Sequence, residues 1–556
     1  MFKRRLKSFL VSRYPWALAA GAVLACAFPN IGLAGLAWIA PALILLPAAG
    51  RSPKMTFRLG YAAGLAHYLI SLSWLLRIPV IGAPILGWAA LSAFMALYPG
   101  VWVWLTWRQF PGRLGEGGPP ANLAELAKRF LTTSWSQRFM WCLFSAALWV
   151  ALEMMITRFL GGFPWNLLGA SQYRMVPLIQ IAAYTGVYGV AFLIVWFAVS
   201  LLCGALAIIG RPALRSAWAA EAILPLTVVA FTYASGYWQV MRPTPPGPEL
   251  KLALIQPSIP QTVIWDAHSS SNRMQQLLDL SRAALTNHPD VLIWPEGVVP
   301  GVPRYQPDLS AALSDLARSN HLWLIIGADD AKLPPNATSW EDGEYYNSSF
   351  LLAPDGGFDA VYKKRQLVIF GEYVPLVRWL PFLKYLTPIQ GGFTPGTGPV
   401  PFKLNEPKAN LSVLICFEDI FPDFAREYAA SDTDFLINLT NDGWFGEGAA
   451  QWQQAACAIF RAVENGLPLV RCANNGLTGW ADAHGRLRNH LETPEHGIYG
   501  PGFLIVRVPL LDPANPRVET YYHRYGDRFG WLCVAFAAFP ILRTLRRRKS
   551  TAPPAP

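Results

Sequence analysis

The sequence has few charged residues for its length. Asp, Glu, Lys and Arg make up 15% of its 556 residues, against about 25% in soluble proteins. Apolar residues make up 53% of the chain, 23 residues are Trp, and the mean hydropathy is +0.27. The shortage of charge excludes an ordinary soluble protein and indicates a membrane protein.

Cysteine is also scarce, and no two cysteines form a CxxC pair. Four of the seven lie in apolar segments and three in the rest of the chain, namely Cys26, Cys142, Cys203 and Cys533, then Cys416, Cys457 and Cys472. This spacing excludes a disulfide-stapled scaffold and a cysteine-based zinc site. We therefore expect no metal and no cofactor, while a disulfide between Cys457 and Cys472 stays open.

The basic residues do not indicate a nucleic-acid surface, although the formal net charge is +11. They cluster in short segments beside apolar runs, as in "MFKRRLKS" at the start and "RTLRRRKS" near the end. Lys and Arg beside apolar segments mark the cytoplasmic side of a membrane protein. We expect no nucleic-acid partner, and we predict that both ends are cytoplasmic.

Eight apolar segments predict about eight membrane-spanning helices. They cover residues 14–28, 31–49, 57–76, 83–107, 139–157, 177–209, 217–238 and 528–542. Each is near the roughly 20 residues that a spanning helix needs, although the first and last are short. An even number of spans agrees with two cytoplasmic ends. A cleavable signal ending near "LACA" is the alternative for the first segment, but the apolar segments that follow favour its retention.

Composition divides the chain into three parts. Residues 1–240 are predicted to form a bundle of about seven transmembrane helices, 241–527 an extracytoplasmic domain, and 528–556 a last transmembrane helix with a basic cytoplasmic tail. The proline-rich "MRPTPPGPEL" marks the first boundary. Beyond it, β-rich runs such as "VLIWPEG" and "LSVLICFE" alternate with helical runs such as "SSSNRMQQLLDLSRAAL". This alternation predicts a layered α/β domain.

Three short motifs of the α/β domain carry candidate catalytic side chains. "LIWPEG" ends an apolar strand in Glu296. "YKKRQLVIFGEYVP" places Lys363, Lys364, Arg365 and Glu372 in a loop, and "LICFED" gives Cys416, then Glu418 and Asp419. A carboxylate base, an ammonium and a thiol are the groups needed for acyl transfer through a thioester. Taken singly each motif is weak, because a cysteine after an apolar run is commonly a small core residue. Their combination in this order is specific.

The three motifs resemble the Glu–Lys–Cys triad of the nitrilase, or carbon–nitrogen hydrolase, superfamily. With the apolar segments, nearly the whole chain resembles the bacterial apolipoprotein N-acyltransferase family. The resemblance extends to "QPSIPQTVIWD", "GFPWNLLGASQ", "GGFTPGTGP" and "NLTNDGWFG". It implies an α-helical transmembrane bundle joined to a nitrilase-like α-β-β-α sandwich.

The resemblance also implies roles for single residues. Glu296 matches the general base, Lys364 the oxyanion-stabilising lysine and Cys416 the nucleophile. Lys364 is preferred to Lys363 because it fits the pattern Y-x-K-x-x-L-V-x-F-G-E. Glu372 and Glu418 match supporting acids that orient the lysine and the acyl acceptor.

The substrate-binding candidates are less uniform. Trp265 matches a tryptophan of the family that handles substrate. Phe417 stands where a tyrosine is often found, and Ile369 replaces a common proline. These departures leave the geometry of a lid and the substrate preference open.

The activity implied by the resemblance is a two-step transfer in the membrane. Cys416 takes a fatty acyl chain from a phospholipid, typically phosphatidylethanolamine, and the α-amine of a diacylglyceryl-cysteine on an apolipoprotein then takes it as an amide. The implied location is the bacterial inner (cytoplasmic) membrane, as a multi-pass protein with its catalytic domain facing the periplasm.

Two other functions fit parts of the sequence. A membrane-tethered nitrilase-type amidase would use the same triad with water as acceptor, and a transporter or lipid-binding scaffold would use the bundle alone. Glu153 and Arg158 lie at or near the end of a predicted span, where charge is costly enough to suggest a purpose. Structural and lipid-contact roles for this pair stay open.

Overall fold

The computed structural model describes residues 13–112, 120, 122–210, 217–242, 247–336, 339–375, 392–512 and 517–550. The chain divides into two compact units. Met1–Ser73, Leu86–Arg242 and Tyr525–Pro556 form the first unit, and Trp74–Ile85 with Pro243–Arg524 form the second. The segment "MFKRRLKS", residues 243–246 of the proline-rich linker and the first residue of "GGFTPGTGP" lie outside the described residues.

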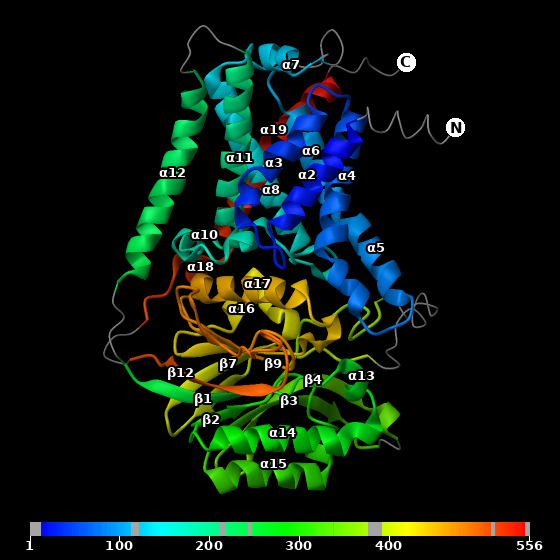
Figure 1. Ribbon diagram of the computed structural model, residues 1–556, viewed down its shortest axis with the longest axis vertical. Helices are drawn as coiled ribbons and strands as arrows, with labels where there is room; N and C mark the ends of the chain where they lie inside the picture. Colours follow the sequence, from blue (N-terminus) through cyan, green and yellow to red (C-terminus); the bar gives the residue numbers. More distant parts are fainter. Residues whose placement is uncertain are drawn as a thin grey trace. The chain divides into compact units, whose positions relative to one another are not determined.

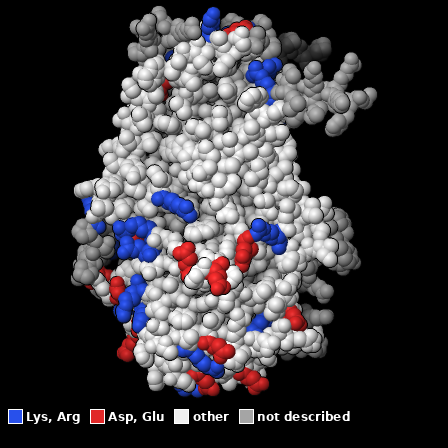
Figure 2. All heavy atoms as spheres, viewed as in Figure 1, with Lys and Arg blue, Asp and Glu red and all other residues white. Residues whose placement is uncertain are grey.

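The first unit is helical (Figure 1). Its main helices are α2 Tyr14–Cys26, α4 Pro53–Ser71, α5 Ala83–Met95, α6 Leu97–Arg108, α7 Leu123–Phe130, α8 Trp135–Ile156, α11 Val187–Gly210, α12 Ala217–Val240 and α19 Arg528–Ser550. Among the described residues, Ala83–Arg108, Trp135–Ile156, Val187–Gly210 and Trp218–Val240 are long and apolar enough to cross a membrane. On the face in Figure 2, charged side chains are sparse over this unit and more frequent over the second.

The predicted spans 31–49 and 177–209 are not single helices. Residues 31–49 form three short helices, η1 Ala34–Trp38, α3 Ala40–Leu45 and η2 Leu46–Ala48. Proline occurs in the first turns of α3 and η2, where its missing N–H ends the preceding hydrogen-bond pattern. Residues 177–209 are broken at Gly186, whose φ of 65° separates α10 Ala182–Thr185 from α11. The apolar runs do not reveal these breaks. A run shows that a segment is long and apolar enough to cross a membrane, but it does not show the backbone angles within it.

Glu153 and Arg158 both have partners inside the first unit. Glu153 accepts hydrogen bonds from the Trp149 indole at 2.9 Å and from the Leu168 backbone N–H at 2.7 Å, so it anchors the segment that contains "GFPWNLLGASQ". Arg158 forms an ion pair with Asp527. These contacts give both residues a structural role.

The second unit contains two six-stranded sheets. Their orders are β12-β1-β2-β3-β4-β5 and β11-β10-β9-β8-β7-β6. The first has β1 Glu249–Gln256, β2 Val291–Ile293, β3 Trp323–Lys332, β4 Glu344–Leu352, β5 Phe358–Lys363 and β12 Gly502–Pro509, and the second has β6 Pro401–Leu404, β7 Ala409–Ile415, β8 Phe435–Thr440, β9 Leu469–Ala473, β10 Gly479–Ala481 and β11 Leu487–His490. The central strands β1–β2–β3 and β7–β8–β9 are parallel.

The two sheets pack face to face and each carries helices on its outer side (Figure 1). One core cluster joins the inner faces and includes Ile293 of β2 and Val413 of β7. A second cluster joins the outer face of the first sheet to Leu277 of α14, Ser270–Leu285, and Leu313 of α15, Pro307–Asn320. The short α16, Pro422–Glu427, and α17, Ala449–Asn465, cover the other sheet. This four-layer arrangement confirms the predicted α/β domain.

All seven cysteines are free. The disulfide that the sequence left open between Cys457 and Cys472 is therefore absent. Cys472 on β9 has its sulfur 3.3 Å from the Ile255 carbonyl oxygen, which gives it a packing position between the sheets.

Candidate active site

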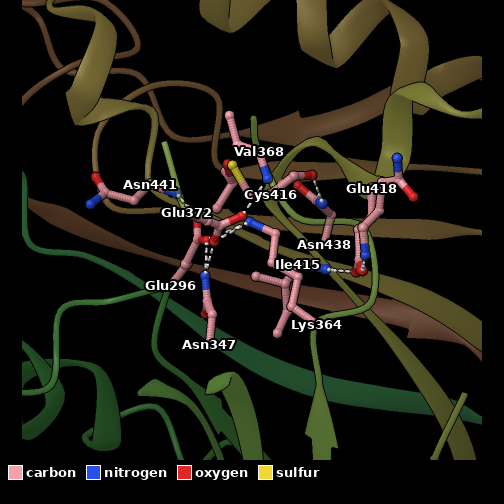
Figure 3. A network of polar contacts seen from close by, with 12 residues as sticks. Glu296, Asn347, Lys364, Val368, Glu372, Ile415, Cys416, Glu418, Asn438 and Asn441 are labelled. Carbon is pink, nitrogen blue, oxygen red and sulfur yellow. Dashed lines mark hydrogen bonds and ion pairs between the residues drawn. The ribbon is translucent and has the colours of Figure 1, made fainter. Parts of the chain in front are cut away.

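Glu296 follows the carboxyl end of β2 and is held by three donors (Figure 3). Its Oε1 accepts hydrogen bonds from Asn347 Nδ2 at 2.7 Å and from Lys364 Nζ at 3.2 Å. Its Oε2 accepts from the Asn441 backbone N–H at 2.9 Å. These donors come from three separate parts of the chain, so the carboxylate has a fixed orientation.

Lys364 immediately follows β5 and is only 1% exposed. Besides Glu296, its Nζ contacts Glu372 Oε1 at 2.9 Å. Burial by itself lowers the pKa of Lys364, but the carboxylates of Glu296 and Glu372 outweigh burial and hold the pKa well above its ordinary value. Lys364 is therefore an ammonium throughout the physiological pH range.

Glu372 connects Lys364 to its own loop. Its Oε1 also accepts from Asn347 Nδ2 at 2.7 Å, and its Oε2 accepts from the Val368 backbone N–H at 2.8 Å. Asn347 thus bridges the two carboxylates from β4. The sequence analysis did not single out Asn347, although a polar residue at the start of the apolar run "NSSFLLA" was a signal.

Cys416 occupies a backbone conformation that a strand does not provide. β7 ends at Ile415, and Cys416 opens the helical turn η10 Cys416–Ile420 with φ +54°. A left-handed conformation at a non-glycine residue costs of order 1–3 kcal/mol and occurs most often at functional sites. The Cys416 carbonyl accepts a hydrogen bond from Asn438 Nδ2 at 2.8 Å, which holds the turn.

The Cys416 thiol lies beside the ammonium and the carboxylates (Figure 3). Burial and then the Glu296 carboxylate raise the pKa of Cys416, and the Lys364 ammonium opposes them. The pKa stays well above its ordinary value, so the resting group is a neutral thiol. A base beside the sulfur is therefore needed to form the nucleophile.

A buried ion network supports the turn at Cys416. Arg471 of β9 donates to Asp419 Oδ2 at 2.7 Å, to Asp442 Oδ2 at 2.8 Å and to Asn438 Oδ1 at 2.9 Å. Burial raises the pKa of Asp419 to about 7, although Arg471 opposes the rise. The network links η10 to the ends of β8 and β9.

Glu418 lies apart from the Glu296 and Lys364 cluster in Figure 3. It is fully buried and accepts from the backbone N–H groups of Ile415, Arg365 and Gln366 at 2.7, 2.8 and 3.0 Å. Tyr362 donates to it at 2.9 Å. Glu418 therefore joins the end of β7 to the segment that follows Lys364. Burial raises its pKa to about 7, against these donors.

The two aromatic candidates occupy different environments. Trp265 is 45% exposed, and its ring centroid lies 5.2 Å from that of Trp444 in an edge-to-face contact. Phe417 is half-buried, with its ring centroid 5.8 Å from Lys364 Nζ. Ile369 is 36% exposed and lies in the loop before Glu372. Phe417 is thus adjacent to the catalytic candidates, whereas Trp265 presents an open aromatic surface.

The part of the chain that the structure describes contains no group of three His, Cys, Asp or Glu side chains placed to hold a metal ion. The chemistry available at this site is that of a thiol, a carboxylate base and a buried ammonium.

Two family models match the chain. The carbon-nitrogen hydrolase model matches residues 251–499, and the model of the apolipoprotein N-acyltransferase N-terminal domain matches residues 20–200. The first match identifies the α/β domain as nitrilase-like.

Known proteins resemble the chain over nearly its full length. The apolipoprotein N-acyltransferase of Geobacter metallireducens is 35% identical over 547 residues, which are 96% of each chain. That of Vibrio vulnificus is 28% identical over 576 residues, covering 98% of this chain and 100% of its own. A solved amidase of Nesterenkonia sp. AN1 from the nitrilase superfamily matches 52% of this chain and 97% of its own, with 19% identity and a TM-score of 0.37.

Proposed function

Because this chain belongs to the apolipoprotein N-acyltransferase family, we propose that it moves a fatty acyl chain from a phospholipid, through a thioester on Cys416, to the N-terminal amine of a diacylglyceryl-modified lipoprotein. One observation supports the chemistry most directly. The ammonium of Lys364 lies between Glu296 and Glu372, at 3.2 and 2.9 Å, beside the thiol of Cys416.

In the first step, Glu296 removes the proton from the Cys416 sulfur, and the thiolate attacks the ester carbonyl of the phospholipid. A C–S bond forms, and the ammonium of Lys364 stabilises the oxyanion. The C–O bond then breaks, the proton on Glu296 passes to the departing oxygen, and a lysophospholipid leaves.

In the second step, the amine of the acceptor attacks the thioester carbonyl. A C–N bond forms and the C–S bond breaks. The proton that the nitrogen loses passes through Glu296 to the sulfur, which restores the neutral thiol of Cys416. The same base and ammonium serve both steps. Because the lysophospholipid leaves before the amine reacts with the acyl-enzyme, the transfer is a ping-pong reaction.

The membrane placement is part of the proposal. We assign eight spans to the eight apolar segments, the bundle to residues 1–240 and 528–556, and the catalytic domain to 241–527 on the periplasmic side of the inner membrane. The helices long and apolar enough to cross support the spans, and the basic segments beside them support the orientation. Both proposed substrates are lipids, which explains why a nitrilase-like domain is joined to a bundle. Phosphatidylethanolamine is the proposed donor.

Intact-mass analysis tests the thioester. The full-length protein in detergent is mixed with phosphatidylethanolamine that carries a labelled palmitoyl chain. We expect a palmitoyl-sized adduct that neutral hydroxylamine removes, and we expect none on Cys416→Ala. Cys457→Ala is the matched control, and it should keep the adduct. An adduct that persists on Cys416→Ala would refute the assignment of the nucleophile.

A second arm separates the transferase from an amidase. When a diacylglyceryl-cysteine lipopeptide is added to the acyl-enzyme, we expect the label to appear as an amide on the lipopeptide. Release of the label only as free fatty acid would instead support transfer to water.

A further inference from the structure

Two neighbouring aspartates of β3 point to opposite faces of the first sheet, as strand alternation requires. Asp330 is fully buried on the outer face, where Arg304 binds both of its oxygens at 3.0 and 2.5 Å. Asp329 lies on the inner face. Its register partner on β4 is Asn347, and paired residues of an antiparallel ladder point to the same side. Asn347 is the residue that bridges the carboxylates of Glu296 and Glu372, so Asp329 faces the candidate active site.

Asp329 differs from the other acids of the site in its lack of hydrogen-bond and ion-pair partners among the described residues. Glu296 and Glu372 each accept several hydrogen bonds, whereas Asp329 is exposed and has no hydrogen bond or ion pair within the described part of the chain. Its carboxylate is therefore available to a substrate.

The charges around Asp329 are not balanced. Its electrostatic partners are Glu372, Glu296 and Arg273 of α14. Arg273 is 6% exposed, and its Nε has no hydrogen-bond partner among the described residues. With the Lys364 ammonium, three carboxylates face two cations, and Asp266 is a further carboxylate that acts on Arg273, so negative charge is in excess. A cation of the substrate is the group that would balance it.

We propose that Asp329 receives the primary ammonium group of a substrate next to the Cys416 thioester. This inference rests on the function proposed above. Two substrates carry that group, namely the lipoprotein acceptor at its N-terminus and the donor in an ethanolamine headgroup.

For the acceptor, the site also supplies a proton step. Asp329 reaches the surface but is surrounded by protein on its other sides, and this partial desolvation, followed by the carboxylates of Glu372 and Glu296, raises its pKa to about 7. An α-amine has a pKa of about 7.7–8.0. The ammonium gives one proton to the Asp329 carboxylate and becomes a neutral amine, which attacks the thioester. Its second proton leaves through Glu296 as described above, and Asp329 then releases its proton to water.

The test uses Asp329→Asn in the full-length protein, with Asp359→Asn as the control at an exposed carboxylate of β5. The preformed acyl-enzyme is mixed with the diacylglyceryl-cysteine lipopeptide, and loss of the thioester is followed from pH 6 to 9. We expect Asp329→Asn to slow this step about 10²-fold. In the wild type the rate should rise through about pH 7, where Asp329 ionises, and Asp329→Asn should lose that rise.

A second measurement identifies the source of the ammonium. Thioester formation is compared with phosphatidylethanolamine and with phosphatidylglycerol, which has no amine. If Asp329→Asn slows formation only with phosphatidylethanolamine, the headgroup is the ligand, and if it slows only thioester consumption, the acceptor is the ligand. Either result supports the proposal. Asp329→Lys should slow the affected step more than Asp329→Asn does, because its charge repels the ammonium.

Two results would overturn the inference. The first is that Asp329→Asn matches Asp359→Asn in both steps. The second is that it slows removal of the thioester by uncharged hydroxylamine as much as removal by the lipopeptide, which would indicate a structural role. A wild type that forms no thioester at all would refute the proposed function and is recognised before either variant is compared.

Discussion

Lys364 is a buried ammonium, and a buried charge without a partner costs several kcal/mol. Two carboxylates offset that cost at 3.2 and 2.9 Å, and each has a separate use. Glu296 lies beside the Cys416 sulfur, while Glu372 also accepts from Val368 and so ties the lysine to its loop. At the residue scale, Glu372 is therefore a positioning residue that acts through Lys364.

Glu372→Gln should lower the rate of thioester formation about 10²-fold, the loss expected when a catalytic group moves by about 1 Å. Because the Glu372 carboxylate raises the pKa of Lys364, its removal lowers that pKa, and activity should decline at a lower pH on the alkaline side. Rates of thioester formation between pH 6 and 11 measure both effects. Glu427→Gln, at an exposed carboxylate paired with Arg365, is the control. An unchanged alkaline limb in Glu372→Gln would contradict the positioning role.

At the element scale, the site is built where parallel strands end. β2 delivers Glu296, β7 delivers Cys416, and β8 and β9 supply Asn438 and Arg471 beneath them. The turn after β7 depends on this support, because a left-handed Cys416 is not a conformation that the strand would adopt by itself. The ion network of Arg471 therefore stabilises both the sheet edge and the nucleophile.

Arg471→Ala should destabilise the protein by about 3–5 kcal/mol, because it leaves Asp419 and Asp442 buried without their cation. Removing Arg471 raises the pKa of Asp419 further above about 7, and an unfolded Asp titrates near about 3.9. The loss of stability is thus larger at pH 8, above the wild-type pKa of Asp419, and smaller at pH 5, where the buried carboxylates take up protons.

The apparent melting temperature of the full-length protein in detergent measures this loss at the two pH values. Arg282→Ala removes an exposed pair with Asp279 and should change stability by less than about 1 kcal/mol. An equal loss at pH 5 and pH 8 would show that the pairing with the aspartates is not the cause.

At the scale of the whole molecule, a short part of the N-terminal half belongs with the catalytic unit. Trp74–Ile85 joins the second compact unit. The Trp74 indole donates to Gln453 of α17 at 3.2 Å, and its ring lies 4.6 Å from that of Phe445. Phe445 lies shortly after Asn441 in the chain, and the backbone N–H of Asn441 donates to Glu296. Trp74, from the N-terminal half of the sequence, thus contacts the loop after β8, which lies beside the candidate active site.

Labelling of single cysteines checks the proposed topology. In spheroplasts of an expressing bacterium, a membrane-impermeant maleimide should modify Asp359→Cys while the inner membrane is unbroken, because β5 belongs to the proposed periplasmic domain. It should modify Ser52→Cys, beside basic Arg51 and Lys54, only after the membrane is opened. The parent protein serves as the background control, since six of its seven cysteines are buried. The reverse labelling pattern would refute the orientation.

The sequence by itself determined the features that depend on residues close together along the chain. The apolar segments, the alternation of strands and helices, and the polar residues at strand ends are local patterns. They indicated the three motifs that carry Glu296, Lys364 and Cys416, and the resemblance to a family then chose Lys364 over Lys363. The family models and the relatives confirm the membrane-linked acyltransferase family.

The tertiary structure alone decided the features that need contacts between distant residues. Asn347 bridges carboxylates 51 and 25 positions away, Arg471 holds Asp419 from 52 positions away, and Asp329 faces the site only because β3 pairs with β4 in one register. The left-handed turn at Cys416 belongs to the same group. The physical reason is that hydrogen bonding and charge balance in a buried site depend on how two sheets pack, and side-chain spacing along the chain does not encode that packing.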